Sequence, residues 1–176
     1  MRWALVVLAS ACAGVPLRVV STPAALPAEA LEGTWQVRAT NFPMWLDGTR
    51  TAPSFTYSHL RRDGEEVRFD DTVGYLERGV PGTIEGVDTQ HPSVATHFTW
   101  RGRGLLALVS SEWDVVALDP AGQWAVIAFT PTLFTPAGVD VVARGALDDD
   151  TLARVRALLD ADPVLGPMAR GLTRLP

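Results

Sequence analysis

The residues whose types suit acid–base chemistry are a small group of carboxylates and one histidine on predicted strands. Asp70 and Asp71 are adjacent, and neighbouring residues of a strand point to opposite faces, so these two cannot form a carboxylate pair by themselves. Asp71 can instead partner Asp88 or His97 across strands, which would make a buried polar cluster. This cluster is the only candidate for enzyme chemistry that the sequence offers.

The three histidines, His59, His91 and His97, do not indicate a metal or haem site. No two of them lie at close ligand spacing, and His91 precedes Pro92 in a predicted turn. The acidic run at residues 148–150 is interpreted as a helix start, where carboxylates accept hydrogen bonds from free backbone N–H groups. We therefore expect neither a metal nor a cofactor.

Cys12 is the only cysteine, which excludes an intramolecular disulfide, a Cys-rich zinc site and a redox pair. Residues 1–14 are apolar after a brief basic start, so they are typical of a secretory signal and too short to span a bilayer as a helix. Leu8 to Cys12 also resembles a bacterial lipoprotein cleavage box, in which the cysteine is acylated. Lipid anchoring, plain export and no export all stay open. Residues 15–31, with prolines among small residues, are predicted to be a linker.

The composition predicts one soluble globular domain. The chain has 176 residues, 47% of them hydrophobic, and a formal net charge of -5. All 15 basic residues are arginines spread thinly along the chain, so there is no basic patch for a nucleic-acid partner.

Hydrophobic residues alternate with a period of two between residues 33 and 144, with turn residues at regular intervals. This pattern predicts an antiparallel meander of eight strands. The apolar run 105–109 is either an extension of a strand or a strand of its own. The expected strands are 35–40, 55–58, 67–76, 83–89, 95–101, 113–118, 124–130 and 139–144.

A helical pattern replaces the alternation after residue 147. Residues 148–151 offer N-terminal caps, and Pro163 limits the helix at its other end. The apolar stripe of this helix has one place to be buried, the outer wall of a barrel. The predicted fold is therefore all-β: an eight-stranded antiparallel up-and-down β-barrel over residues 32–176, with a C-terminal α-helix packed outside. The stripe consists of Leu152, Val155, Leu158 and Leu159.

Three separated segments carry a family resemblance. They are Gly33 to Trp35, Trp113 to Asp119 with 124–126, and the segment 139–144 that ends in an arginine. In this order, and near these spacings, they resemble the Gly-x-Trp motif, the strand–acidic turn–strand region and the final strand of the lipocalins. The sequence is most similar to the bacterial branch of this family of calycin β-barrels.

The resemblance implies structural roles for four residues. Trp35 is expected to plug the closed end of the barrel, with Arg144 lying across it in a cation–π contact worth about 0.5 to 2 kcal/mol. Gly33 and Asp119 complete the expected structural signature, and none of the four is expected to be catalytic.

The interior of an eight-stranded barrel is wide enough either to be filled by side chains or to hold one small ligand. Strand aromatics favour an apolar pocket for an acyl chain, isoprenoid or tetrapyrrole, and a filled core is the alternative. Met44 and Trp45 lie in a loop expected at the open mouth, either as a lid or as packing on strand ends. The expected ligand-binding residues are Trp45, Phe55, Tyr57, Phe69, Asp71, His97, Trp100, Trp113 and Trp124.

These patterns predict a lipocalin-like carrier for a small hydrophobic ligand of the lipid, fatty-acid or isoprenoid class. We expect it at a bacterial envelope, in the periplasm or anchored through Cys12, with a cytoplasmic location as the alternative. Two rival hypotheses stay open: a lipid or isoprenoid isomerase or hydrolase on the same fold, which we favour less, and a structural envelope protein with a filled barrel. Thiol-dependent isomerisation is excluded because the barrel contains no cysteine.

Overall fold

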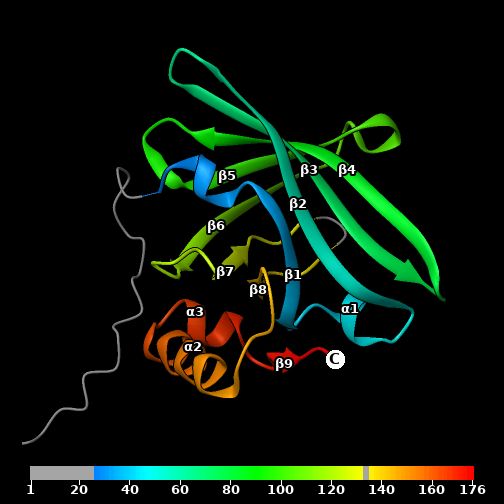
Figure 1. The fold of residues 1–176 in the computed structure, drawn as a ribbon, viewed down its shortest axis with the longest axis vertical. Helices are drawn as coiled ribbons and strands as arrows, with labels where there is room; N and C mark the ends of the chain where they lie inside the picture. The colour runs from blue at the N-terminus through cyan, green and yellow to red at the C-terminus, as the bar shows by residue number, and fades with distance from the viewer. Residues whose placement is uncertain (1–25, 133–134) are drawn as a thin grey trace, which may run out of the picture.

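Eight antiparallel strands form the body of the protein in a computed structural model that describes residues 26–132 and 135–176 (Figure 1). Each strand pairs with the next along the chain, and β8 pairs with β1, so the sheet closes into a barrel. This closure confirms the predicted eight-stranded up-and-down architecture. The strands are β1 (Gly33–Thr40), β2 (Arg50–Asp63), β3 (Glu66–Glu77), β4 (Val80–His91), β5 (Val94–Gly102), β6 (Ser110–Leu118), β7 (Trp124–Phe129) and β8 (Gly138–Ala143).

The closing strand β1 is shared between three partners. Its first half, Gly33 to Gln36, pairs with β2, whereas its second half pairs with β8. A ninth strand, β9 (Thr173–Arg174), pairs with Ala39 and Thr40 of β1, after β2 has left that edge. The sequence analysis missed β9, because two residues are too few to show alternation.

Strand β2 is much longer than the predicted segment 55–58. Ala52 and His59 adopt positive φ angles of 49° and 52°, and the register with β3 shifts beside each of them. Such bulges bend a strand and interrupt its alternation, which is why the pattern was visible only between them. The bend lets β2 pair with β3 along most of its length and with β1 over only residues 54–57.

The C-terminal helix α2 (Asp149–Ala161) begins where its cap predicts. The Asp148 carboxylate accepts hydrogen bonds from the Thr151 backbone N–H and hydroxyl at 2.7 and 2.8 Å. Leu152, Val155 and Leu159 are buried against the outer wall of the barrel, as the helical stripe predicted. The remaining short helical elements are η1 (Ala28–Leu31), α1 (Pro43–Leu46), η2 (Gly104–Leu106) and α3 (Leu165–Met168).

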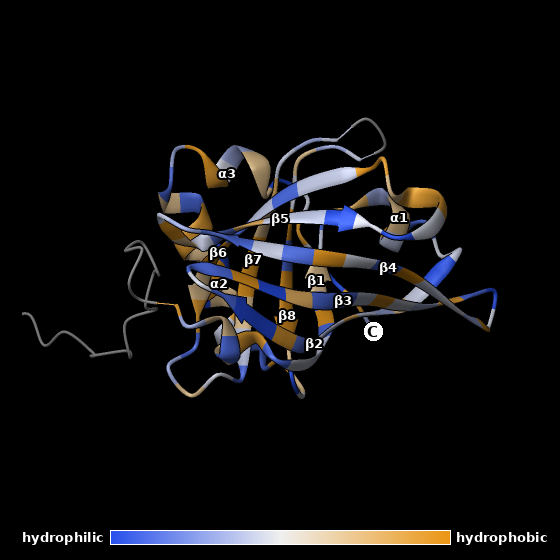
Figure 2. Cartoon of the chain, turned by 90° about the horizontal axis from the view of Figure 1, so that it is seen from above, coloured by the Kyte–Doolittle hydropathy of each residue, from blue (hydrophilic) through white to orange (hydrophobic). Residues whose placement is uncertain are grey.

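Two hydrophobic cores result from this arrangement, one inside the barrel and one between its wall and α2. Strand β8 separates them: Val139, Val141 and Ala143 belong to the outer core, whereas Val142 belongs to the inner one. This strand is therefore buried on both faces, and it is coloured mostly as hydrophobic in Figure 2.

Two sequence expectations need correction. Leu26, Ala28 and Leu31 are buried in the inner core, so the folded part includes residues that we had assigned to the linker 15–31. The apolar run 105–109 is not a strand, since it contains the end of η2 and the turn that follows it. Within the described residues, no helix is long and apolar enough to cross a membrane.

Candidate ligand-binding site

The closed end of the barrel is built around Trp35 and Arg144. The Arg144 guanidinium lies 4.0 Å from the centroid of the Trp35 ring, which is the expected cation–π contact. Arg144 also donates hydrogen bonds to the backbone carbonyls of Ala30 and Glu32 at 3.1 and 2.7 Å. The Trp35 indole N–H donates to the Leu31 carbonyl at 2.6 Å, so both side chains fasten η1 across the barrel floor.

Gly33 is required at this floor for two reasons. Its φ angle of 103° is one that residues with a side chain rarely adopt. A Cβ at this position would also lie 2.7 Å from the Arg144 guanidinium. The Gly-x-Trp motif thus leaves room for the arginine that covers the tryptophan.

Replacing Arg144 by Ala should lower the free energy of unfolding by about 1 to 3 kcal/mol. The variant loses the cation–π contact and leaves the carbonyls of Ala30 and Glu32 without their donor. Denaturant unfolding measures the effect, and Arg101→Ala on the exposed outer wall is the matched control. Equal unfolding midpoints for the wild type and Arg144→Ala would contradict this role.

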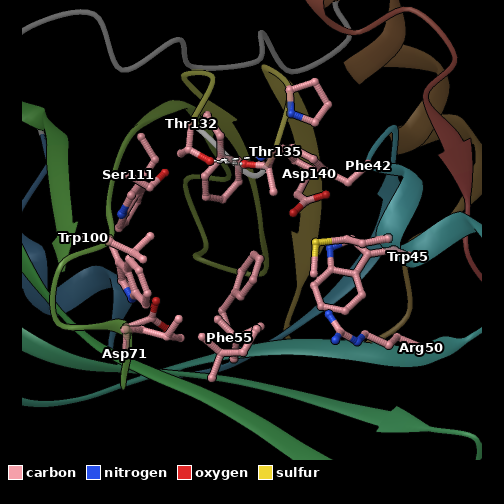
Figure 3. A pocket seen from close by; sticks show the side chains of 18 of the residues that line it. Phe42, Trp45, Arg50, Phe55, Asp71, Trp100, Ser111, Thr132, Thr135 and Asp140 are labelled. Carbon is pink, nitrogen blue, oxygen red and sulfur yellow. Dashed lines mark hydrogen bonds between the residues drawn. The ribbon is translucent and has the colours of Figure 1, made fainter. Parts of the chain in front are cut away.

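Above the floor, the barrel encloses a cavity of about 580 Å³ (Figure 3). This volume falls within the range of about 300 to 1,000 Å³ that is typical of small-molecule sites. Most of the wall is apolar or aromatic, with few polar groups. The apolar and aromatic lining comprises Phe42, Pro43, Met44, Trp45, Phe55, Tyr57, Val73, Ile84, Trp100, Leu106, Val109, Trp113, Phe129 and Pro136.

Two carboxyl groups, Asp71 and Asp140, line the cavity, and Asp88 is buried nearby in the barrel. Burial raises the pKa of Asp88 and of Asp140 to about 7, and burial together with the charge of Asp88 raises the pKa of Asp71 well above its usual range. One oxygen of each carboxyl is buried without a hydrogen-bond partner among the described residues. Asp71 and Asp140 are therefore available to a bound molecule, and all three carboxyls are available to a proton.

An aromatic stack separates the cavity from the filled lower half of the barrel. The Trp113 ring stacks on Phe98 at 4.3 Å and on Tyr57 at 5.7 Å between centroids. Its indole N–H donates to Asp88 Oδ1 at 2.7 Å, which opposes the effect of burial on that pKa. Trp113 and Tyr57 thus line the cavity, whereas Phe98 and Phe69 lie beyond them in the inner hydrophobic core.

The short helix α1 covers part of the open mouth. Trp45 is only 6% exposed, and its ring centroid lies 6.0 Å from that of Tyr75. The Arg50 guanidinium lies 4.9 Å from the Tyr75 ring centroid and 3.5 Å from Glu77. Figure 3 shows Trp45 and Arg50 on the same side of the cavity.

Exchanging Trp45 for Ala should speed the release of a bound apolar probe by about tenfold and change its rate of entry much less. A side chain over the mouth acts on escape, because it must move aside before the occupant leaves. Stopped-flow dilution of a probe–protein complex measures the release rate. Leu46→Ala, on the exposed side of the same helix, serves as the control, and equal release rates from the wild type and Trp45→Ala would count against the lid.

Comparisons with known proteins agree with this architecture. No protein-family model and no curated sequence matches the chain. Among solved structures, the siderocalin Ex-FABP matches with a TM-score of 0.59 at 15% identity, over 84% of this chain and 94% of its own. The major allergen Per a 4 from cockroaches matches with a TM-score of 0.57 at 17% identity, over 88% of this chain and 90% of its own. This chain has the lipocalin fold.

In the lipocalin barrel, six of the nine residues expected to bind ligand line the cavity together. Phe69 does not, since it lies in the packed lower half, with its ring 5.2 Å from Tyr57 and 5.6 Å from Phe98. The six cavity residues are Trp45, Phe55, Tyr57, Asp71, Trp100 and Trp113.

His97 and Trp124 lie outside the lipocalin barrel. Phe98 points inward, so its neighbour His97 faces outward, where its Nδ1 lies 3.1 Å from Asp114. The predicted partnership of His97 with Asp71 is therefore wrong, and Asp88 is the group that interacts with Asp71. Trp124 packs in the outer core, because it lies on the same face of β7 as Val126 and Ala128.

Asp119 has a structural position, since its carboxylate accepts a hydrogen bond from the Gln123 backbone N–H in the β6–β7 turn. Cys12, the signal-like segment 1–14 and most of the predicted linker lie outside the described residues. Among the residues that are described, no three His, Cys, Asp or Glu side chains gather where they could hold a metal ion.

The sequence analysis missed several residues of the lipocalin cavity. Asp140 is one of them, although strict alternation along 139–144 places it on the same face as Val142, inside the barrel. Phe42, Leu106 and Val109 reach the cavity from outside the regular strands, where the sequence carries no periodic signal.

Proposed function

We propose that this protein binds and carries a small apolar molecule in the barrel cavity. The observation that supports this proposal is the cavity, which has a volume of about 580 Å³, an aromatic wall and a closed floor. A barrel with a purely structural role gains nothing from such a space, because unfilled volume costs stability. Lipids, fatty acids and isoprenoids are the ligand classes that an apolar wall of this size favours.

Mass spectrometry of molecules extracted from natively purified protein tests this function. An apolar compound in about equimolar amount supports carriage, whereas a pair of compounds related by one chemical step supports an enzyme on the same barrel. Protein that yields no compound, and that binds none when offered a panel of lipids, contradicts the proposal.

We also propose that the carrier acts at a bacterial envelope, anchored through an acylated Cys12. The support is the sequence from Leu8 to Cys12 after an apolar start. Acyl chains on a processed cysteine give firm anchoring, because more than one chain is inserted. We expect the wild type in the membrane fraction and Cys12→Ser in the soluble fraction. Identical partitioning of the two proteins would contradict anchoring and would leave the proposal of ligand binding in the cavity unaffected.

A further inference from the structure

The charges inside the barrel are of one sign. Asp71 and Asp140 line the cavity, and Asp88 lies close enough to affect the charge state of Asp71. Among the described residues that line the cavity, the only basic one is Arg50 at the mouth. Its guanidinium lies over the Tyr75 ring and forms an ion pair with Glu77. A buried anion would meet uncompensated negative charge, whereas a buried cation would meet its counter-charge.

Two aromatic residues, Tyr57 and Trp100, lie near Asp71 in the barrel wall. Asp71 pairs in register with Tyr57 on one side and with Gly86 on the other. The Trp100 indole lies directly over Gly86, where any side chain would overlap it. Figure 3 shows the side chains of Asp71 and Trp100 next to each other in the wall of the cavity. The absence of a side chain at residue 86 thus brings a large ring beside the acid.

The polar atoms of this region lack partners within the protein. Asp71 Oδ1 and Trp100 Nε1 are both buried without a hydrogen bond among the described residues, and Asp71 is 94% buried. Leaving the Asp71 oxygen without a donor costs free energy, so a ligand N–H group that donates to it gains more than it would at an exposed site. The Trp100 N–H is itself a donor, so an ammonium group pairs with Asp71 and not with this nitrogen. A carboxylate among aromatic faces suits an alkylammonium group, which binds anions and π-faces alike.

We propose that the cavity selects amphiphilic amines, with the ammonium group beside Asp71 and the apolar tail among the aromatic side chains. This inference rests on the proposed carrier function, and within the apolar molecules considered there it favours amines over fatty acids. The raised pKa of Asp71 agrees with it, because the group lacks a cation that an ammonium ion would supply.

The test uses three ligands of equal chain length, decylamine, decanol and decanoate, which compete at about pH 8 with the neutral fluorescent probe N-phenyl-1-naphthylamine. We expect decylamine to bind about tenfold more tightly than decanol, and decanoate to bind least. Asp71→Asn should abolish the preference for the amine over decanol, because the amide carries no charge. Asp114→Asn, on the outer wall beside His97, is the matched control and should behave as wild type.

The possible failures are distinguishable. Equal affinities for the three ligands, tightest binding of decanoate, or an amine preference that survives in Asp71→Asn would each overturn the inference while the carrier function stands. Decanol binding by Asp71→Asn shows that the variant is folded. If the probe does not bind the wild type at all, the proposed function fails and this inference fails with it.

Discussion

Lowering the pH from about 8 to about 5 should raise the free energy of unfolding by several kcal/mol. The pKa values of Asp88 and Asp140 are about 7 in the folded protein, against a usual 3.8, so the folded state holds protons that the unfolded state releases. Stability therefore falls as the pH rises from about 4 to about 7 and stays low above that. For one such carboxyl the loss is about 4 kcal/mol.

Below about pH 4, the free energy of unfolding should change in the opposite direction and fall as the pH falls. Burial raises the pKa of Asp70, but the hydrogen bonds and charges of Arg61 and Arg103 outweigh burial and lower this pKa. Backbone N–H groups lower the pKa of Asp148. Their contributions are present above their unfolded pKa values and are lost as the pH falls through their folded ones. We therefore expect maximum stability at about pH 4, with a decline on both sides of it.

Asp140→Asn isolates one buried carboxyl in this pH dependence. The amide is neutral at every pH, so the variant should be more stable than the wild type at about pH 8 and should approach it as the pH falls to about 4. Asp160→Asn on the exposed face of α2 is the control, and its curve should run parallel to that of the wild type. Thermal unfolding across the pH range measures all three. A wild-type stability that is flat or rising between pH 5 and pH 8 would show that these carboxyls are not buried as described.

Trp113→Ala should destabilise the protein more than any other single change in the cavity wall. Trp113 is 2% exposed, and its loss removes the stacks with Phe98 and Tyr57. Truncating a buried Trp costs about 3 to 5 kcal/mol, and the loss of the N–H donor to Asp88 adds about 1 to 3 kcal/mol. The melting temperature should fall by about 10 to 20 °C.

Trp113→Phe separates packing from hydrogen bonding at this position. Phenylalanine keeps a ring in the stack but gives Asp88 no donor, so the pKa of Asp88 should rise further. This variant should be closest to wild-type stability at about pH 5 and weakest above about pH 7. If Trp113→Ala unfolds within about 1 kcal/mol of the wild type, the stack does not support the cavity floor.

The sequence predicted the parts of this protein that depend on regular repetition. Val67 and Phe69 alternate with polar neighbours, and the stripe of α2 repeats at helical spacing, so the barrel and its outer helix follow from local patterns. The contact between Trp35 and Arg144 came from the family resemblance, and no spacing in the chain would have revealed it.

The rest depends on irregular backbone. Strand β2 bends at Ala52 and His59, which adopt left-handed backbone conformations. Neither residue type indicates a bulge in the sequence. His97 and Trp124 were assigned to the cavity by residue type, although the inward direction of Phe98 already placed His97 outside. The cavity acid Asp140 was missed because its strand is buried on both faces and shows little alternation.

Direct titration of the cavity tests the central claim, that the barrel holds one apolar molecule above Trp113. N-phenyl-1-naphthylamine is added to the wild type and to Val73→Trp, in which a large ring fills the lined space. The account predicts binding of one probe per wild-type chain with sub-millimolar affinity, and at least about tenfold weaker binding to Val73→Trp at unchanged fold. No emission change with the wild type, or equal binding by the two proteins, would contradict it.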